Sequence, residues 1–283
     1  MKKIKTIGVV GAGQMGSGIA QVAAVSGYSV LLYDAFPGVA EKSGERIKAS
    51  LDKLLAKGKL EHEKHDFAMQ AIQVVDNLVD VAQADLVVEA AVEKVELKKE
   101  LFAALDKAAA PDVILASNTS SISLTEIASA TKRPDKVIGM HFFNPAPVMK
   151  LLEVVKGYLT SQETIDTILE VGKQMDKVTV LAVDKAGFIV NRILDPMLNE
   201  AIFLLEEGVG TAEDIDNGMK FGCNHPMGPL ALTDLIGLDV LLAVMEVLYR
   251  EYGDSKYRPA PLLKKMVRAG KLGKKTGEGF FKY

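Results

Sequence analysis

The feature that most constrains this chain is a strand, glycine loop, helix and strand pattern within its first 34 residues. Residues 4–10 form a short apolar, β-branched run typical of a buried strand, and residues 14–26 place apolar side chains at helical spacing. Between them stands Gly11-Ala12-Gly13-Gln14-Met15-Gly16, and a second strand at Ser29–Tyr33 ends at Asp34. A lone G-x-G-x-x-G is weak evidence, but here all parts of a dinucleotide-binding unit follow in order.

Each key position of this motif has a physical reason to bind a dinucleotide. Gly11 permits a tight turn, Gly13 lets the backbone approach a diphosphate, and Gly16 lets the helix pack closely on the strand. Free N–H groups at the helix start favour phosphate, whereas Asp34 can accept hydrogen bonds from a ribose diol and would repel a 2′-phosphate. We therefore predict NAD as cofactor, with NADP less favoured; the alternative is a glycine-rich turn in another α/β protein. The predicted cofactor contacts here are Gly11, Gly13, Gln14, Met15, Gly16 and Asp34.

Composition places the chain among ordinary globular proteins. Its 283 residues are 48% hydrophobic and 25% charged, which suits one large or two modest domains with a sizeable core. The net charge of −3 does not favour nucleic acid or a membrane surface, and no apolar run is long enough to span a bilayer. The single Cys223 excludes an intrachain disulfide, and with no signal-peptide pattern we expect a cytoplasmic protein.

Strand and helix patterns alternate through the first two thirds of the chain, which predicts a Rossmann-type, doubly wound, mostly parallel sheet. Beyond residue 185 the patterns predict only helices. We therefore expect a nucleotide-binding domain at 1–185 and an all-helical substrate and dimerisation domain at 186–283. Further strands are predicted at 72–75, 85–90, 113–116, 137–140, 151–155 and 177–180, and helices at 95–109, 124–131, 163–175, 188–207, 212–221, 231–252 and 261–269.

Three helical segments carry more specific expectations. The helix at 95–109 is expected to bury Leu97, Leu101, Leu105 and Ala108 along one face. The apolar helices at 193–205 and 235–248 have more apolar surface than so small a domain can cover, which predicts a subunit interface.

Residues 39–69 are strongly charged, with a single apolar helical face, so part of this segment is expected to project as an arm. Two interpretations stay open. The arm is either a solvated outer face or a cationic surface for a phosphorylated ligand, with Ser50 and Lys57 about two helical turns apart. We interpret His62 and His65 as solvated, and we predict no metal site.

Polar residues gather where the predicted strands end, which is where ligands bind in such sheets. One group is residues 117–121, and the most unusual string begins at His141, which ends a strand before a proline-rich loop. Twelve positions on, Glu153 stands among apolar residues and is not expected to be buried unpaired. An antiparallel return would bring it beside His141, giving a base suited to taking a hydroxyl proton as hydride leaves the same carbon. The alternative is a structural His–Glu pair.

Taken together, these motifs resemble the L-3-hydroxyacyl-CoA dehydrogenase family, and within it the bacterial 3-hydroxybutyryl-CoA branch. The resemblance covers essentially the whole chain and has no departure at the motif positions. The motifs that carry it are the glycine motif with Asp34, SNTSS at 117–121, HFFNPAPVMKLLEV at 141–154, GFIVNR at 187–192 and GEGFFKY at 277–283.

The resemblance implies a role for each matching position. His141 would be the general base, or the acid in the reducing direction, and Glu153 would orient it and stabilise its cationic form. Ser120 and Asn191 would hydrogen-bond the reacting substrate oxygens. Positions implied near the cofactor are Glu93, Lys98, Asn144 and Lys275, and those implied near coenzyme A are Ser50 and Lys57.

The resulting hypothesis is an NAD(H)-dependent dehydrogenase that interconverts (S)-3-hydroxybutyryl-CoA and acetoacetyl-CoA, with cofactor and thioester meeting between the two domains. Its expected partners are an acyl-CoA thioester and a second copy of the chain in a homodimer. One alternative is a β-hydroxyacid or sugar-acid dehydrogenase on the same fold, although those relatives commonly have a lysine where this chain has Asn191. The other is a non-catalytic NADH-binding protein, which the intact set of His141, Glu153 and Asn191 disfavours.

Overall fold

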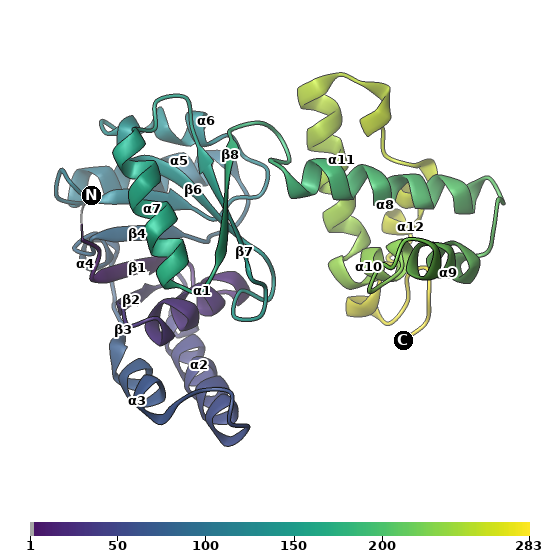
Figure 1. Cartoon of the computed structure of the whole chain (residues 1–283). Coiled ribbons are helices and arrows are strands. Elements are labelled where there is room, and N and C mark those ends of the chain that lie inside the picture. The colour runs from purple at the N-terminus through teal and green to yellow at the C-terminus, as the bar shows by residue number, and fades with distance from the viewer. Residues whose placement is uncertain (1–2) are drawn as a thin grey trace. The chain divides into compact units, whose positions relative to one another are not determined.

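The computed structural model describes residues 3–283, and the chain divides into two compact units, Met1–Lys185 and Ala186–Tyr283 (Figure 1). The first unit is built on one eight-stranded sheet with the strand order β3-β2-β1-β4-β5-β6-β7-β8. Neighbouring strands pair in parallel, except that β6 and β7 are antiparallel. The predicted doubly wound, mostly parallel sheet is therefore confirmed. The strands are β1 (Thr6–Val10), β2 (Ser29–Tyr33), β3 (Ile72–Val74), β4 (Leu86–Glu89), β5 (Ile114–Ser117), β6 (Val137–Phe142), β7 (Leu151–Lys156) and β8 (Val178–Val183).

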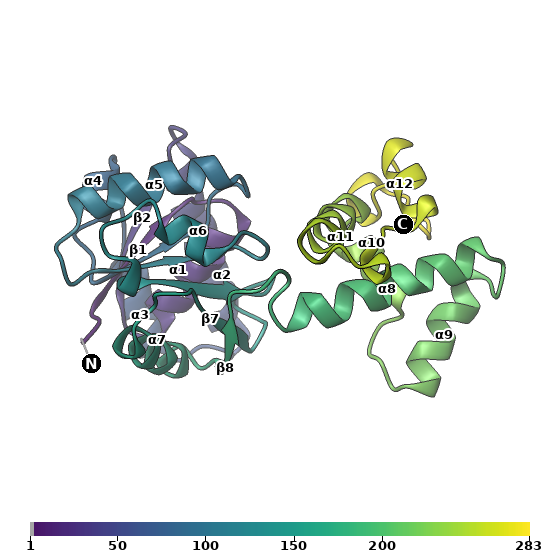
Figure 2. The same cartoon turned by 90° about the horizontal axis from the view of Figure 1, so that it is seen from above.

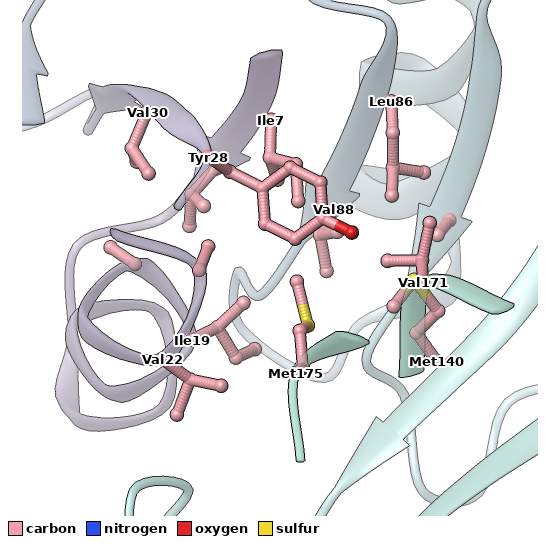
Figure 3. Close-up of a cluster of buried hydrophobic side chains, with 14 of the residues drawn as sticks. Ile7, Ile19, Val22, Tyr28, Val30, Leu86, Val88, Met140, Val171 and Met175 are labelled. Atoms are coloured by element: carbon pink, nitrogen blue, oxygen red, sulfur yellow. The ribbon is translucent and has the colours of Figure 1, made fainter. Parts of the chain in front are cut away.

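Helices cover both faces of this sheet. Figure 2 shows α4 (Leu78–Val81), α5 (Val95–Ala108) and α6 (Leu124–Ala128) on one side, with α1 (Gln14–Val25) and α7 (Gln162–Gln174) on the other. On the α1 and α7 side, apolar side chains from both helices meet those of the strands in one buried cluster. Members of this cluster drawn in Figure 3 include Ile7, Ile19, Val88, Met140, Val171 and Met175.

The buried face of α5 differs from the predicted one. The fully covered side chains are Lys98, Phe102 and Leu105, whereas Leu97 and Leu101 are only partly buried. The helix is rotated from the expected orientation because Lys98 faces inward and pairs with the buried carboxylate of Glu89, which an apolar pattern does not reveal.

The charged segment forms two helices, α2 (Val39–Ala56) and α3 (His62–Ala71), which Figure 1 shows extending beyond the sheet from the side of β3. The expectation that His65 is solvated was wrong. Its side chain is buried between the helices, with Nε2 at 2.8 Å from Oδ1 of Asp52 and Nδ1 at 3.1 Å from Oδ1 of Asp66. These hydrogen bonds, to Asp66 first and then Asp52, raise the pKa of His65, so its charged form helps to join α3 to α2.

The second unit is helical, as predicted. The prediction of one continuous helix at 231–252 was wrong, because Gly237, with φ of 105°, separates two helices within this range. Residues such as Leu198, Leu241 and Leu248 form its buried core, while Ile193, Phe221 and Leu235 are exposed. None of the helices within residues 3–283 is long and apolar enough to cross a membrane. The helices are α8 (Val190–Glu206), α9 (Ala212–Gly222), α10 (Pro229–Ile236), α11 (Leu238–Tyr252) and α12 (Pro261–Arg268), with short 3-10 turns at Pro134–Lys136 in the first unit and at Ser255–Tyr257 and Lys274–Thr276 in the second.

Candidate active site

The carboxyl ends of β4, β5 and β6 bring polar side chains to one face of the sheet. Strand register places Glu89 opposite Ser117 and His141 opposite Glu153. The residues immediately before these four on their strands, which are Val88, Ala116, Met140 and Leu152, belong to the core cluster on the α1 and α7 side. Because side chains alternate between the faces of a sheet, all four polar groups point to the opposite face.

The His141–Glu153 pair is the centre of this arrangement. Nδ1 of His141 lies 2.7 Å from Oε2 of Glu153, and both side chains are buried. This confirms the predicted antiparallel return. An ionised carboxylate can only accept a hydrogen bond, so the ring keeps a proton on Nδ1, and any proton exchanged with a substrate must pass through Nε2. The ring of Phe143 packs against the imidazole, with 4.5 Å between ring centroids, and limits its movement.

A buried ionic network lies two strands away. Oε1 of Glu89 accepts hydrogen bonds at 2.6 Å from Nζ of Lys98 and from the Ala91 amide, and Oε2 accepts one at 2.6 Å from Oγ of Ser117. Glu89 and Lys98 are both fully covered. Glu89 was not among the residues predicted for the site; the available signal was an acidic residue closing an otherwise apolar strand.

The network continues into the loop that carries Ser120. Nζ of Lys98 is 3.2 Å from Oε2 of Glu93, whose Oε1 accepts hydrogen bonds from the amides of Ser120 and Ser121 and from the hydroxyl of Thr119. Burial raises the pKa of Glu93, but the Lys98 charge and these hydrogen bonds outweigh it and hold the pKa below its ordinary value. Lys98 is thus placed beneath the surface and acts on the site through Glu93.

The glycine loop has the geometry that a diphosphate requires. Gly11 has a φ of 96° and passes so close to Ala90 that a Cβ would lie 2.7 Å from the Ala90 carbonyl oxygen. Gly13 faces open space, with no atom within 4 Å of a built Cβ. At Gly16 a Cβ would lie 1.7 Å from the Gly11 carbonyl oxygen but 3.5 Å from Val9, which is an ordinary contact distance. A side chain at this position would therefore clash with the glycine loop, and not with the strand as we expected.

The neighbouring groups fit a dinucleotide as well. Helix α1 has no side-chain cap, so its first amides, which include those of Gln14 and Met15, are oriented to bind an anion. Oδ2 of Asp34 accepts the Ala12 amide at 2.7 Å, which fixes the carboxylate at the tip of β2. A cavity of about 230 Å³ opens beside Asp34 and suits an adenosine; its lining includes Tyr33, Phe36, Pro37, Val74 and Val75.

The proline-rich loop after β6 is fixed by a buried lysine. Lys177 is buried, and its Nζ donates hydrogen bonds to the carbonyls of Ala146 at 2.6 Å and Met149 at 2.8 Å. Burial lowers the pKa of this ammonium. The loop presents Asn144 at the surface, next in sequence to Phe143. Sequence reasoning missed Lys177, because its two partners are backbone carbonyls about 30 positions earlier.

The remaining predicted residues lie away from this sheet edge or in the other unit. Ser50 is half-buried within α2, and Lys57 is exposed directly after that helix. Asn191 is the second residue of α8 and is half-buried, while Lys275 is exposed in the C-terminal turn and forms an ion pair with Asp239. The structure therefore brings His141 together with Glu153, and Ser120 together with Glu93 and Lys98. Asn191 and Lys275 belong to the helical unit.

Comparisons with known proteins agree with this geometry. Residues 6–185 match the family model for the 3-hydroxyacyl-CoA dehydrogenase NAD binding domain, and residues 187–283 match the model for the C-terminal domain of the same family. A protein of Clostridioides difficile named 3-hydroxybutyryl-CoA dehydrogenase is 52% identical over 98% of this chain and 99% of its own length. One of Bradyrhizobium diazoefficiens with the same name is 47% identical over 99% and 96% of the two chains. The crystal structure of (S)-3-hydroxybutyryl-CoA dehydrogenase from Ralstonia eutropha has a TM-score of 0.96 at 48% identity, covering 99% of both chains.

Proposed function

Because this chain belongs to the 3-hydroxyacyl-CoA dehydrogenase family, we propose that it interconverts (S)-3-hydroxybutyryl-CoA and acetoacetyl-CoA with His141 as the general acid and base. The chain is an NAD-dependent oxidoreductase. The observation that carries the proposal is the 2.7 Å contact between His141 and the buried Glu153, at the sheet edge where this fold binds its ligands.

In the reducing direction, His141 protonates the substrate oxygen. Nε2 of the imidazolium donates its proton to the alkoxide that forms on the keto carbon, while the carboxylate of Glu153 holds Nδ1–H and stabilises the positive ring. NADH supplies the hydride to that carbon when it is bound. Ser120 and Asn191 are proposed to donate hydrogen bonds to the substrate oxygens, which favours the transition state, where negative charge on oxygen is largest. In the oxidising direction the same groups act in reverse.

The cofactor is proposed to be held by the glycine loop and by Asp34, with Asn144 helping to shape the nicotinamide site and Glu93, Lys98 and Lys275 placed near the cofactor. Asp34 favours NADH over NADPH, because its carboxylate would lie close to the 2′-phosphate and repel it. Lys98 contributes by keeping Glu93, and through it the Ser120 loop, in one conformation.

Coenzyme A is proposed to bind along the arm. Ser50 and Lys57 stand on or just after α2, a helix that carries several exposed lysines and is suited to phosphate groups. We further propose a homodimer formed through the helical unit, since the exposed side chains of Ile193, Phe221 and Leu235 are the kind that a subunit interface covers. Sedimentation of the purified chain tests the dimer; a monomer at micromolar concentration would contradict it.

The test of the function is the loss of NADH absorbance with acetoacetyl-CoA, run beside free acetoacetate and beside NADPH. We expect rapid turnover with the thioester and NADH, and little with either alternative. Turnover of free acetoacetate without coenzyme A would instead support a hydroxyacid dehydrogenase. A protein that binds NADH but turns over none of these compounds would contradict a catalytic function.

A further inference from the structure

Arg46 is a surface cation on α2 that reaches the glycine loop. Its Nη2 donates a hydrogen bond to the Ala12 carbonyl at 3.4 Å, near the limit of a useful bond, and the same carbonyl already accepts Oγ of Ser17 at 3.1 Å. No carboxylate among residues 3–283 forms an ion pair with Arg46, although many other basic side chains on the surface have such a partner. The guanidinium therefore lies beside the loop with most of its five donors unused.

The space in front of Arg46 is a cavity of about 500 Å³. Gly13 contributes an open surface to it, since nothing lies within 4 Å of the position that a Cβ would take. The cavity is also bounded by the start of α1, whose first turn has neither an acidic residue nor a side-chain cap. Its lining includes Gly13, Gln14, Ser17, Arg46 and Pro147.

The glycine loop itself supplies no full positive charge. A diphosphate that joins two nucleosides carries two negative charges, whereas a helix N-terminus provides the equivalent of only about half a positive charge. A guanidinium adds a full charge and a planar pair of N–H donors that match two phosphate oxygens. We propose that Arg46 binds the diphosphate of an adenosine diphosphate ligand at the glycine loop, an ionic contact that the G-x-G-x-x-G motif does not provide.

Two ligands of the proposed function carry this group, NADH and the coenzyme A thioester, and the assignment to one of them rests on that function. The cofactor is favoured, because Gly13 and Gln14 of the cofactor motif line the same cavity as Arg46. Ser17 and Ser43 join α1 to α2 by a hydrogen bond between their hydroxyls, which sets the helix that carries Arg46 against the loop.

The experiment compares Arg46→Ala with Lys48→Ala, which removes the same charge from an exposed position on the other side of α2. NADH, ADP-ribose and adenosine are titrated without thioester. We expect Arg46→Ala to weaken binding of NADH and ADP-ribose about tenfold or more, because charge-assisted hydrogen bonds are lost, while adenosine binds as before. The difference should shrink as salt is raised, and Arg46→Lys should recover part of it. Lys48→Ala should change none of the three.

The KM for acetoacetyl-CoA separates the two sources. A raised KM with unchanged NADH and ADP-ribose binding would assign Arg46 to the diphosphate of coenzyme A. Unchanged binding of all these ligands, or an equal loss for adenosine, would overturn the proposal. Because ADP-ribose binding needs no turnover, an enzyme that fails to reduce acetoacetyl-CoA would refute the proposed function and leave the Arg46 test intact.

Discussion

Two buried acidic side chains, one in each unit, are held in opposite ways. In the sheet unit, Glu89 is fully covered and accepts hydrogen bonds from Lys98, Ser117 and the Ala91 amide. In the helical unit, Asp195 on α8 is also buried, but its Oδ2 has no hydrogen-bond partner within the described part of the chain. Burial alone raises the pKa of Asp195 to about 7. A carboxyl group is thus held as a compensated charge at Glu89, whereas at Asp195 it is a buried acid whose pKa is raised to about 7 and whose charge has no partner.

The compensated acid has a positioning role that Asp195 lacks. The Glu89 network joins the end of β4 to the Ser120 loop through Lys98 and Glu93, so its compensated charges position the site. Other acids in the helical unit are satisfied by backbone amides: Asp216 accepts those of Leu230 and Ala231, and Asp234 those of Phe280 and Phe281. Asp195 has no such support, and the structure gives no role for its charge.

The largest expected effect comes from breaking the compensated pair. Lys98→Met leaves Glu89 buried without its cation, and we expect the free energy of unfolding of the sheet unit to fall by about 3 to 5 kcal/mol. The measurement is urea unfolding followed by circular dichroism, together with NADH affinity. The matched control is Lys99→Met, because Lys99 is only partly covered and lies 3.9 Å from Glu126. Equal losses in the two variants would show that the network contributes little.

The opposite result is expected for Asp195→Asn, which should stabilise the protein at high pH. The unfolded carboxyl ionises near pH 4 and the folded one near pH 7, so the wild type loses stability as pH rises between these values. Removing the charge should recover up to about 4 kcal/mol at pH 8 and almost nothing at pH 4. Thermal unfolding at both values measures the gain, with Asp234→Asn as a control that should lose stability. A gain for Asp195→Asn that does not depend on pH would contradict the ionisation argument.

A smaller effect sharpens the comparison within the sheet unit. Ser117→Ala removes one of the three donors to Glu89 and keeps the ion pair, so we expect a loss of about 2 kcal/mol in unfolding free energy. Urea unfolding gives the value, and the double variant with Lys98→Met tests coupling. Strict additivity of the two losses would mean that the hydroxyl and the ammonium do not share one network.

The sequence was sufficient to predict the parts of the site that follow from regular patterns. The strand alternation and the short return from His141 to Glu153 predicted their pairing, and the glycine motif predicted the loop and Asp34. The burial of Lys98 was not predictable, because a lysine counts as exposed until the acids that surround it in space are known. The buried face of α5 was misplaced for the same reason.

Other features depend on packing between segments that are distant in sequence. His65 lies in a charged and polar stretch of the sequence, which predicts exposure. The packing of α3 on α2 nevertheless covers its side chain and supplies Asp52 as a hydrogen-bond partner. Gly237 lies in an otherwise continuous helical pattern, and only its left-handed backbone shows that α10 ends there. In the sequence, nothing distinguishes Arg46 from the other charged residues around it. Only the fold shows that its guanidinium lies beside the Ala12 carbonyl.

The most direct test of the central claim is the effect of His141→Ala on single-turnover oxidation of NADH by acetoacetyl-CoA, with NADH affinity measured on the same protein. If His141 transfers the proton, the rate should fall by about 10²- to 10⁴-fold while the Kd for NADH stays within about twofold, since the glycine loop and Asp34 are untouched. A variant that retains the wild-type rate, or that loses rate and NADH affinity equally, would contradict the role assigned to this histidine.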